Sequence, residues 1–297
     1  MPTAHAHGID LTYETSGSST DPCILLVHGY GAQLIQWPEE LYDGLADLGY
    51  FVVRMDNRDV GLSTKLSGQF PQLGAPVPGT FSPTLLAPPP YTLRDMAADA
   101  LGVLDALGVE RAHLVGASLG GTVVQRIAIE HPERVLSLTS VMSSPGDPTL
   151  PPAAPEATAA LLSAAPPDRQ GYLDHMTPVL QALWGPSFEE SRARAQLAAR
   201  YDRAYYPEGM IRQMAALVSD GDRTTELAAV AVPTLVLHGR EDALVPLAHG
   251  EATAAAVPSA RLVVLDGMGH DLPPSHMPAI VSAIAEHARQ ASAPVAG

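Results

Sequence analysis

The stretch that decides the fold is Gly116-Ala117-Ser118-Leu119-Gly120-Gly121, which fits the pattern G-x-S-x-G. An apolar run at 112–115 precedes it and a helical pattern at 119–130 follows it, so the serine falls on a strand-to-helix turn. Such a turn needs glycine two residues on either side of the serine because the two backbones pass closely there. The hydroxyl is then expected to project above the sheet at the positive end of a helix. We interpret Ser118 as a candidate nucleophile, with an ordinary glycine-rich turn as the alternative.

The rest of the chain supplies the strands and helices that such a turn requires. Apolar runs without polar alternation recur at 23–29, 50–56, 112–116, 135–141, 233–239 and 261–266. Strands that helices cover on both faces have this pattern. Helical patterns lie between the runs, for example at 92–108. We predict one α/β domain around a mostly parallel sheet, with 8–15 as an antiparallel edge strand.

One interval is much longer than a crossover between parallel strands needs. About ninety residues separate Val141 from Pro233, whereas about a dozen would suffice. The interval is rich in alanine and proline, and helical patterns follow at 168–184, 189–201 and 207–218. We predict a helical lid at 144–231, inserted over the carboxyl edge of a core domain formed by 1–143 and 232–297. The proline-rich run at 66–93 is predicted as a surface loop.

A serine nucleophile needs a base, and the base needs an acid that orients it. Asp242 follows the strand at 233–239, and His270 follows the strand at 261–266. Carboxyl ends of parallel strands meet at one edge of a sheet, so both side chains could converge on Ser118. Glu241 and Asp266 are the rival acids, and alternating side-chain direction makes Glu241 point away from Asp242.

The other histidines are expected to be structural or solvated. They lie in strands, at helix ends or on helices and loops without the turn context, and they are His113, His131, His175, His238, His249, His276 and His287. His5 and His7 are expected to lie in a mobile terminus. No acidic or cysteine residue shares a ligand spacing with these two, so we predict no metal site.

Two backbone amides are expected to hold an oxyanion above the serine. One is the amide of Leu119, which follows the nucleophile, and the other is the Tyr30 amide in His28-Gly29-Tyr30-Gly31. A plain turn is the alternative for this loop. The charged segment Asp56-Asn57-Arg58-Asp59-Val60-Gly61-Leu62-Ser63 is interpreted as a hydrogen-bonded brace for that loop, and a substrate-binding loop is the alternative.

Composition excludes several classes of function. The 297 residues carry a formal net charge of -15, which argues against nucleic acid and anionic membranes as partners. Cys23 is the single cysteine, so no intramolecular disulfide can form. Lys65 is the single lysine and lies in no phosphate-binding loop, so we predict no nucleotide cofactor. The absence of a secretory signal pattern and of a long apolar run predicts a soluble, cytoplasmic protein, and the alanine-rich, lysine-poor composition hints at a GC-rich bacterial genome.

Together these motifs make the chain resemble the α/β-hydrolase fold superfamily over essentially its full length. The residues that carry the resemblance are His28–Gly31, Asp56–Ser63, Gly116–Gly121, His238–Asp242 and Gly267–His270. The variant at Asp56–Ser63 is similar to that of bacterial esterases near the aclacinomycin methylesterase group. The resemblance implies an eight-stranded sheet with a helical lid after strand six. It also implies Ser118 as nucleophile, Asp242 as acid, His270 as base and the Tyr30 and Leu119 amides as oxyanion hole.

The resemblance further implies a cofactor-free serine hydrolase that cleaves esters of small to medium apolar substrates. Lactone, methyl-ester or C–C bond hydrolysis by the same residues is the alternative, and a non-catalytic ligand-binding module is another. Partners are expected to be small-molecule esters, and the chain is expected to be a monomer or homodimer. The candidates to line the substrate pocket, unless they only pack the lid, are His28, Met176, Leu183, Trp184, Tyr205 and Tyr206.

Overall fold

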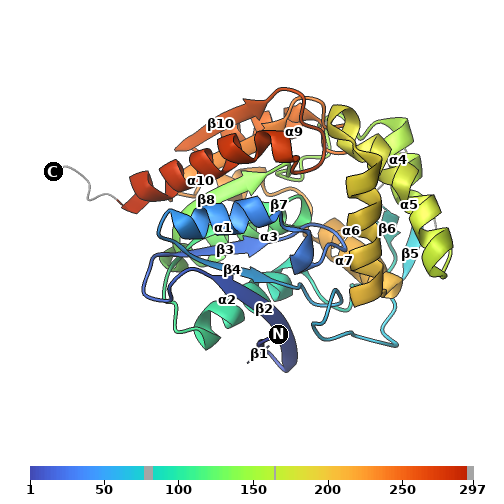
Figure 1. The fold of residues 1–297 in the computed structure, drawn as a ribbon, viewed down its shortest axis with the longest axis horizontal. Coiled ribbons are helices and arrows are strands. Elements are labelled where there is room, and N and C mark those ends of the chain that lie inside the picture. Colours follow the sequence, from blue (N-terminus) through green and yellow to red (C-terminus); the bar gives the residue numbers. More distant parts are fainter. Residues whose placement is uncertain (77–82, 164, 293–297) are drawn as a thin grey trace.

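A computed structural model describes residues 1–76, 83–163 and 165–292. Its centre is an eight-stranded sheet in the order β1-β2-β4-β3-β7-β8-β9-β10 (Figure 1). The strands are β1 Thr3–Ala6, β2 Ile9–Ser16, β3 Cys23–Val27, β4 Phe51–Met55, β7 Ala112–Ala117, β8 Val135–Val141, β9 Thr234–Gly239 and β10 Ala260–Leu265. The pairs β1–β2 and β2–β4 are antiparallel, and the other pairs are parallel. The predicted α/β-hydrolase architecture with its mostly parallel sheet is therefore confirmed.

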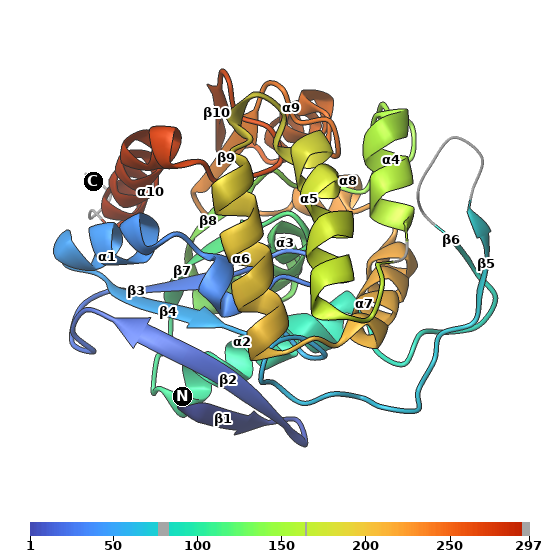
Figure 2. The ribbon, with the colours of Figure 1, turned by 45° about the vertical axis from the view of Figure 1, so that its right-hand side comes forward.

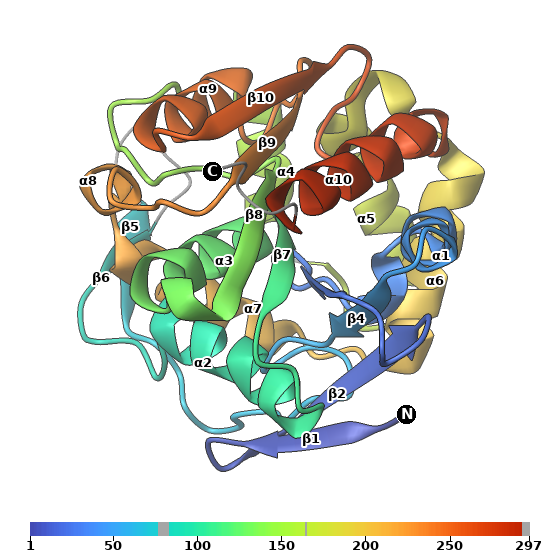
Figure 3. The same cartoon turned by 90° about the vertical axis from the view of Figure 1, so that its left-hand side faces the viewer.

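Helices cover both faces of the sheet, which explains why β3, β7 and β9 are buried along their whole length. One apolar cluster joins α2 (Leu93–Ala106) and α3 (Leu119–Glu130) to one face, with Val257 beside α9 (Leu247–Ala256). A second cluster joins α1 (Glu39–Asp47) and α10 (Met277–Ser292) to the opposite face (Figure 3). Short 3-10 helices lie at Leu34–Gln36, Pro132–Arg134, Gly185–Ser187 and Pro274–His276. The strands therefore had to be apolar on both sides, as the sequence indicates.

The chain between β8 and β9, residues 142–233, is here named the inserted segment. It contains α4 (Pro155–Leu162), α5 (Arg169–Trp184), α6 (Glu190–Arg203), α7 (Pro207–Asp220) and α8 (Thr224–Leu227). Figure 2 shows α4 to α7 gathered together at one end of the sheet. The helices predicted at 168–184, 189–201 and 207–218 are present within two residues, and α4 was not predicted. Leu227 of α8 packs into the core of the body, so this last helix belongs with the sheet.

Two expectations about loops are wrong. Residues 3–6 are not a mobile tail but form β1, because Ala4 is buried opposite Leu11 of β2. The antiparallel strand expected at the edge is therefore second in the sheet. The proline-rich run includes a small antiparallel pair, β5 (Leu73–Pro76) and β6 (Pro83–Leu85), with prolines at strand ends where a missing N–H is tolerated. Residues 77–82 of this run lie outside the described residues.

Candidate active site

Ser118 stands on the sharp turn between β7 and α3. Its φ is 54°, in the left-handed region that side chains rarely adopt, and its amide donates to the Val141 carbonyl at 2.9 Å. A Cβ on Gly120 would overlap the Val27 carbonyl of β3, and a Cβ on Gly116 would overlap the Gly120 carbonyl. Both glycines are thus needed so that the helix can start directly against the sheet. The turn exposes a serine hydroxyl at a helix N-terminus.

The structure brings Ser118, His270 and Asp242 together. Taken as the Nδ1-protonated tautomer, His270 donates from Nδ1 to Asp242 Oδ2 at 2.7 Å. Its Nε2 then accepts from the Ser118 hydroxyl, with Nε2 and Oγ 3.0 Å apart. Asp242 is 4% exposed, whereas the imidazole of His270 is partly open to solvent. This series joins a half-buried hydroxyl to a buried carboxylate through one imidazole.

The turn after β9 fixes the carboxylate of Asp242. Its Oδ1 accepts from the amides of Leu244 and Val245 at 2.9 and 2.8 Å. The buried ring of His238 donates from Nε2 to the Val245 carbonyl at 2.7 Å, and this Nε2 lies 3.7 Å from Asp242 Oδ2. Burial lowers the pKa of His238, so its ring is neutral and holds the turn.

The rival acids face elsewhere. Glu241 accepts from the Gly267 amide at 2.7 Å, so its carboxylate braces the next turn. Asp266 pairs with Arg240 on the surface, since 77% of its side chain is exposed. Of these three acidic residues, Asp242 is therefore the one whose carboxylate contacts His270.

Two other buried histidines, His113 and His287, and the half-buried His249 have structural partners. His113 bonds to Ser137, and His287 donates to the carbonyls of Leu138 and Pro233. His249 contacts Ser144 and the Pro151 carbonyl. Burial lowers the pKa of His113 to about 4. None of these rings reaches Ser118.

The loop after β3 lies directly beside the nucleophile. A Cβ on Gly29 would lie 3.1 Å from the Ser118 Cβ. Among the described residues, neither the Tyr30 amide nor the Leu119 amide donates a hydrogen bond to the protein. The ring of His28 lies against Trp37, with centroids 4.5 Å apart, and burial lowers its pKa to about 4. The loop thus places a free amide next to the serine.

The charged segment at 56–63 braces this loop. Asn57 donates to the His28 carbonyl at 3.0 Å, and Asp56 accepts from the Leu34 amide at 2.8 Å. Asp56 also pairs with Arg203 of α6 at 2.7 Å. The predicted bracing role matches these contacts, and the segment additionally ties the body to the inserted segment.

The pocket candidates divide into two groups. The Leu183 carbonyl accepts from the His270 amide at 2.8 Å, and a Cβ on Gly269 would overlap the Trp184 carbonyl, so this end of α5 adjoins the candidate base. The side chains of Leu183 and Trp184 are nevertheless buried in an apolar cluster of the inserted segment, and the side chains of Met176, Tyr205 and Tyr206 also pack or bond within that segment. Tyr205 stacks on Tyr201 with centroids 4.7 Å apart, Tyr206 accepts from Arg212, and Met176 packs against both apolar clusters of the segment.

Sequence reasoning missed the residues that the inserted segment brings to the loop after β3. Gln213 of α7 accepts from the Gly31 amide at 2.8 Å and donates to the Arg58 carbonyl at 3.1 Å. The Nη2 atom of Arg200 on α6 lies 3.1 Å from the position of a Cβ on Gly31. No motif marks either residue, because only tertiary packing brings them here.

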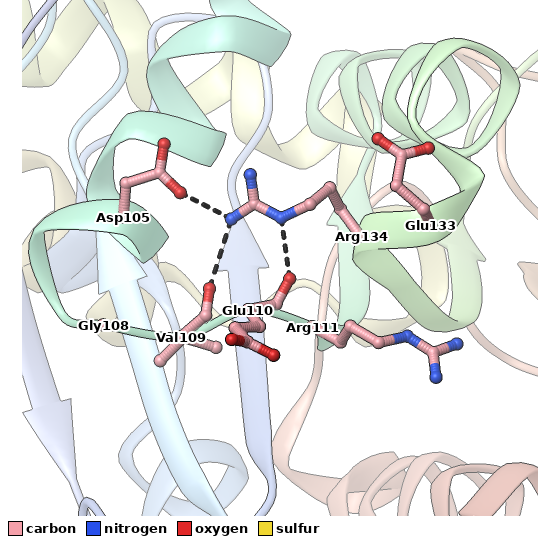
Figure 4. A pocket seen from close by; sticks show the side chains of 7 residues that line it. All are labelled: Asp105, Gly108, Val109, Glu110, Arg111, Glu133 and Arg134. Carbon is pink, nitrogen blue, oxygen red and sulfur yellow. Dashed lines mark hydrogen bonds and ion pairs between the residues drawn. The ribbon is translucent and has the colours of Figure 1, made fainter.

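A shallow hollow elsewhere on the surface carries no comparable chemistry. Figure 4 shows Arg134 at its centre, donating to Asp105 and to the carbonyls of Val109 and Glu110. This hollow lies before β7 and Ser118 lies after it, so the two are about 20 Å apart. Among the described residues, no group of three or more His, Cys, Asp or Glu side chains could hold a metal ion. In the same part of the chain, no helix is both long and apolar enough to cross a membrane.

Comparison with known proteins agrees with this geometry. Residues 22–276 match the family model for the alpha/beta hydrolase fold. The chain belongs to the α/β-hydrolase family. This α/β hydrolase is 31% identical to the rhodomycin D methylesterase of Streptomyces peucetius, over 98% of this chain and all of that protein. It is also 32% identical to the 2-hydroxymuconate semialdehyde hydrolase of Pseudomonas sp. (strain CF600), over 67% of this chain and 70% of that protein.

A solved structure shows the same fold. The enol-lactonase from Burkholderia xenovorans LB400 superposes with a TM-score of 0.73 at 23% identity, over 96% of this chain and 99% of that one. The predicted resemblance to α/β-hydrolase esterases is confirmed by the family match and the methylesterase relative. These comparisons support the prediction that the chain is an ester-acting hydrolase.

Proposed function

We propose that this α/β hydrolase cleaves carboxylic esters of small to medium apolar substrates through Ser118, His270 and Asp242. The observation that supports this best is the hydrogen-bonded series from the Ser118 hydroxyl through His270 to the buried carboxylate of Asp242. The methylesterase relative makes methyl esters one of the substrate types to test. The proposal needs no cofactor.

The proposed reaction runs through an acyl-enzyme. Nε2 of His270 takes the proton of the Ser118 hydroxyl as Oγ attacks the ester carbonyl carbon. Asp242 keeps Nδ1 protonated and stabilises the imidazolium that forms. His270 then gives the proton to the leaving alkoxide, which departs as the alcohol. Water repeats the sequence on the acyl-enzyme and releases the carboxylic acid.

The amides of Tyr30 and Leu119 are the proposed oxyanion hole. Both flank the serine and have no protein partner, so they can donate to the tetrahedral oxyanion. Loss of one such donor in a serine hydrolase costs roughly 3–4 kcal/mol of transition-state stabilisation. The neighbouring Gly31 amide is already bonded to Gln213, which leaves the Tyr30 amide as the free donor of this loop.

The inserted segment is the proposed lid, within the predicted limits 144–231. Its α5 end contacts His270, and its α6 and α7 contact the loop after β3. Residues that close over Ser118 from this side would set the acyl and alcohol preference. The backbone of Leu183 and Trp184 adjoins His270 while their side chains are buried in the segment's apolar cluster, and we propose this end of α5 as the part of the lid that an apolar substrate meets first.

The test is hydrolysis of p-nitrophenyl esters from acetate to palmitate and of methyl esters followed by proton release. Wild type is compared with Ser118→Ala and with Ser282→Ala, an exposed serine on α10 that serves as control. We expect Ser118→Ala to lose several orders of magnitude in kcat, since removing a serine nucleophile costs about 10⁶ in a comparable enzyme. A fluorophosphonate should label the peptide that carries Ser118 and no other serine.

Two results would contradict the proposal. One is a folded wild type that is inert on every ester, which would favour the ligand-binding alternative or the C–C bond alternative. The other is an esterase activity that survives Ser118→Ala, which would place the chemistry elsewhere. If a lactone is hydrolysed faster than every open-chain ester, the proposed substrate class changes from open-chain esters to lactones, and the proposed roles of Ser118, His270 and Asp242 stay the same.

A further inference from the structure

Arg200 differs from the other arginines of α6 in having no acidic partner. Arg192 pairs with Asp271 at 2.6 Å, Arg194 pairs with Asp174 at 2.8 Å, and Arg203 pairs with Asp56 at 2.7 Å. Among the described residues, no carboxylate lies within 4.0 Å of the Arg200 guanidinium. In a chain with 32 acidic residues, an unpaired and half-buried guanidinium needs an explanation.

The Arg200 head lies over the loop that carries the proposed oxyanion amide. Its Nη2 is 3.1 Å from the position of a Cβ on Gly31, and its one acceptor in the described protein is the Met210 sulfur at 3.3 Å. Sulfur is a weak acceptor, and a guanidinium has five donors. Most of the hydrogen-bonding capacity of Arg200 is therefore unused at this point.

The loop after β3 limits the distance between Arg200 and the nucleophile. A Cβ on Gly29 would lie 3.6 Å from Ser118 Oγ, and Gly31 follows two residues later. Two residues span at most about 7 Å between Cα atoms, and the two Cα–Cβ bonds add about 3 Å, so Nη2 lies no more than about 17 Å from Oγ.

The charge of Arg200 reaches the residues beside the serine. Burial lowers the pKa of His28 to about 4, and the positive charge of Arg200 adds to that lowering. Burial also raises the pKa of Tyr30 to about 12, and the same charge opposes this rise. The positive charge of Arg200 therefore acts on two side chains of the loop that adjoins the serine.

We propose that Arg200 is a specificity residue that binds a carboxylate on the substrate, so that the preferred esters, otherwise apolar, carry one anionic group a few bonds from the scissile carbonyl. This rests on the proposed function, because it places the ester at Ser118. The net charge of -15 does not oppose this proposal, since a local cation outweighs distant surface charges for a group that it contacts directly. Guanidinium and carboxylate form bidentate hydrogen bonds, which gives the contact direction as well as energy.

The experiment compares matched substrates. The monomethyl esters of succinic, glutaric and adipic acid carry a carboxylate, and their half-amides are neutral analogues of similar shape. We measure kcat/KM by proton release for wild type, Arg200→Gln, Arg200→Lys and Arg194→Gln, the last being a control on the same helix. The readout is the ratio of kcat/KM for each acid to that for its half-amide.

In wild type we expect a ratio above one that peaks at one chain length. Because a hydrogen bond to a charged group is worth about 1.5–3 kcal/mol, Arg200→Gln should lower the ratio by about 10- to 100-fold. Arg200→Lys should keep part of the preference, and Arg194→Gln should keep all of it. A wild-type ratio at or below one for every chain length overturns the proposal, as does a ratio that Arg200→Gln leaves unchanged.

A binding measurement separates this proposal from the proposed function. Calorimetry of glutarate with wild type and with Arg200→Gln needs no turnover. In one outcome, wild type hydrolyses the half-amide esters, Ser118→Ala does not, and Arg200→Gln leaves both the hydrolysis and glutarate binding unchanged. That result would support the esterase function and refute the carboxylate subsite. If no ester is turned over, glutarate binding that Arg200→Gln abolishes would still support the subsite, and its absence in wild type would refute it.

Discussion

Replacing Arg212 with methionine should be among the most destabilising single changes in the inserted segment. The guanidinium of Arg212 on α7 binds Asp59 of the body twice, Nε to Oδ2 at 2.8 Å and Nη2 to Oδ1 at 3.1 Å. It also donates to the Tyr206 hydroxyl and to the Gln69 carbonyl. Both charged side chains are 0% exposed. Methionine has a similar length but leaves the carboxylate of Asp59 buried beside an apolar group.

The magnitude follows from that buried carboxylate. Removing one partner of a buried ion pair costs about 3–5 kcal/mol, because the remaining charge stays desolvated. The Leu66 amide still donates to Asp59 Oδ1 at 2.8 Å, which places the expected loss toward the lower end. In domains of roughly this size 1 kcal/mol shifts Tm by about 2–4 °C, so the expected drop is about 6–20 °C.

Urea unfolding followed by circular dichroism measures this loss. The exposed pair of Arg169 and Asp202 gives the control, since Arg169→Met should leave the midpoint unchanged within error. The double variant Asp59→Asn with Arg212→Met should regain part of the loss, because asparagine tolerates the φ of 68° and removes the bare charge. A cost below about 1 kcal/mol for Arg212→Met would refute the reasoning, as would a double variant less stable than the single one.

Three further changes test other parts of the structure. Gly120→Ala should remove most of the activity and lower Tm, because its Cβ would overlap the Val27 carbonyl of β3. Gly44→Ala on α1 is the control, since its Cβ has room and the change should be neutral or stabilising by up to about 1 kcal/mol. If the two variants had the same activity and the same Tm, the prediction would be contradicted. Burial lowers the pKa of His113 to about 4, so between about pH 6.5 and 4 the unfolded chain binds a proton that the folded chain does not, and stability falls as the pH falls. Urea unfolding at each pH measures the free energy of unfolding, and His113→Gln should reduce its fall between about pH 6.5 and 4 by up to about 3 kcal/mol. If the variant loses as much stability over this range as wild type, other groups cause the fall. His238→Phe removes the donor that holds the turn of the acid and should lower kcat by roughly 10²-fold with little change in KM; a change in KM alone would contradict this positioning role.

The sequence predicts the strands that are apolar on both faces and misses β1. β3, β7 and β9 are short apolar runs because both faces are buried, and this pattern is easily read. β1 has no such pattern, since Ala4 is its one buried residue and its pairing depends on the turn at Gly8, with a φ of 79°. The helix α4 had a usable signal in Pro155 at its first position before an alanine-rich run.

The candidate site divides in the same way. Ser118, Asp242 and His270 each follow a strand of the sheet, so sequence order and topology together predict where they meet. Arg200 and Gln213 come from helices whose packing on the body depends on many side chains at once, and no local pattern marks them. Of the pocket residues predicted from the lid, Tyr205 fills the segment's own small core, since an isolated helical layer must bury aromatic side chains to hold together.

The turn at 56–63 links the position of the inserted segment to the alignment of the proposed oxyanion amide. From the body, Asn57 donates to the His28 carbonyl at one end of the loop after β3. Gln213 of α7 accepts a hydrogen bond from the Gly31 amide at the other end of this loop, and it donates one to the Arg58 carbonyl in the turn at 56–63. The Tyr30 amide lies between these two fixed points. A displacement of α7 would therefore release the loop, because a fully buried glutamine cannot keep both bonds if its helix moves. The alignment of the proposed oxyanion amide thus depends on the position of the inserted segment, and the ion pairs of Asp56 with Arg203 and of Asp59 with Arg212 hold α6 and α7 against this turn.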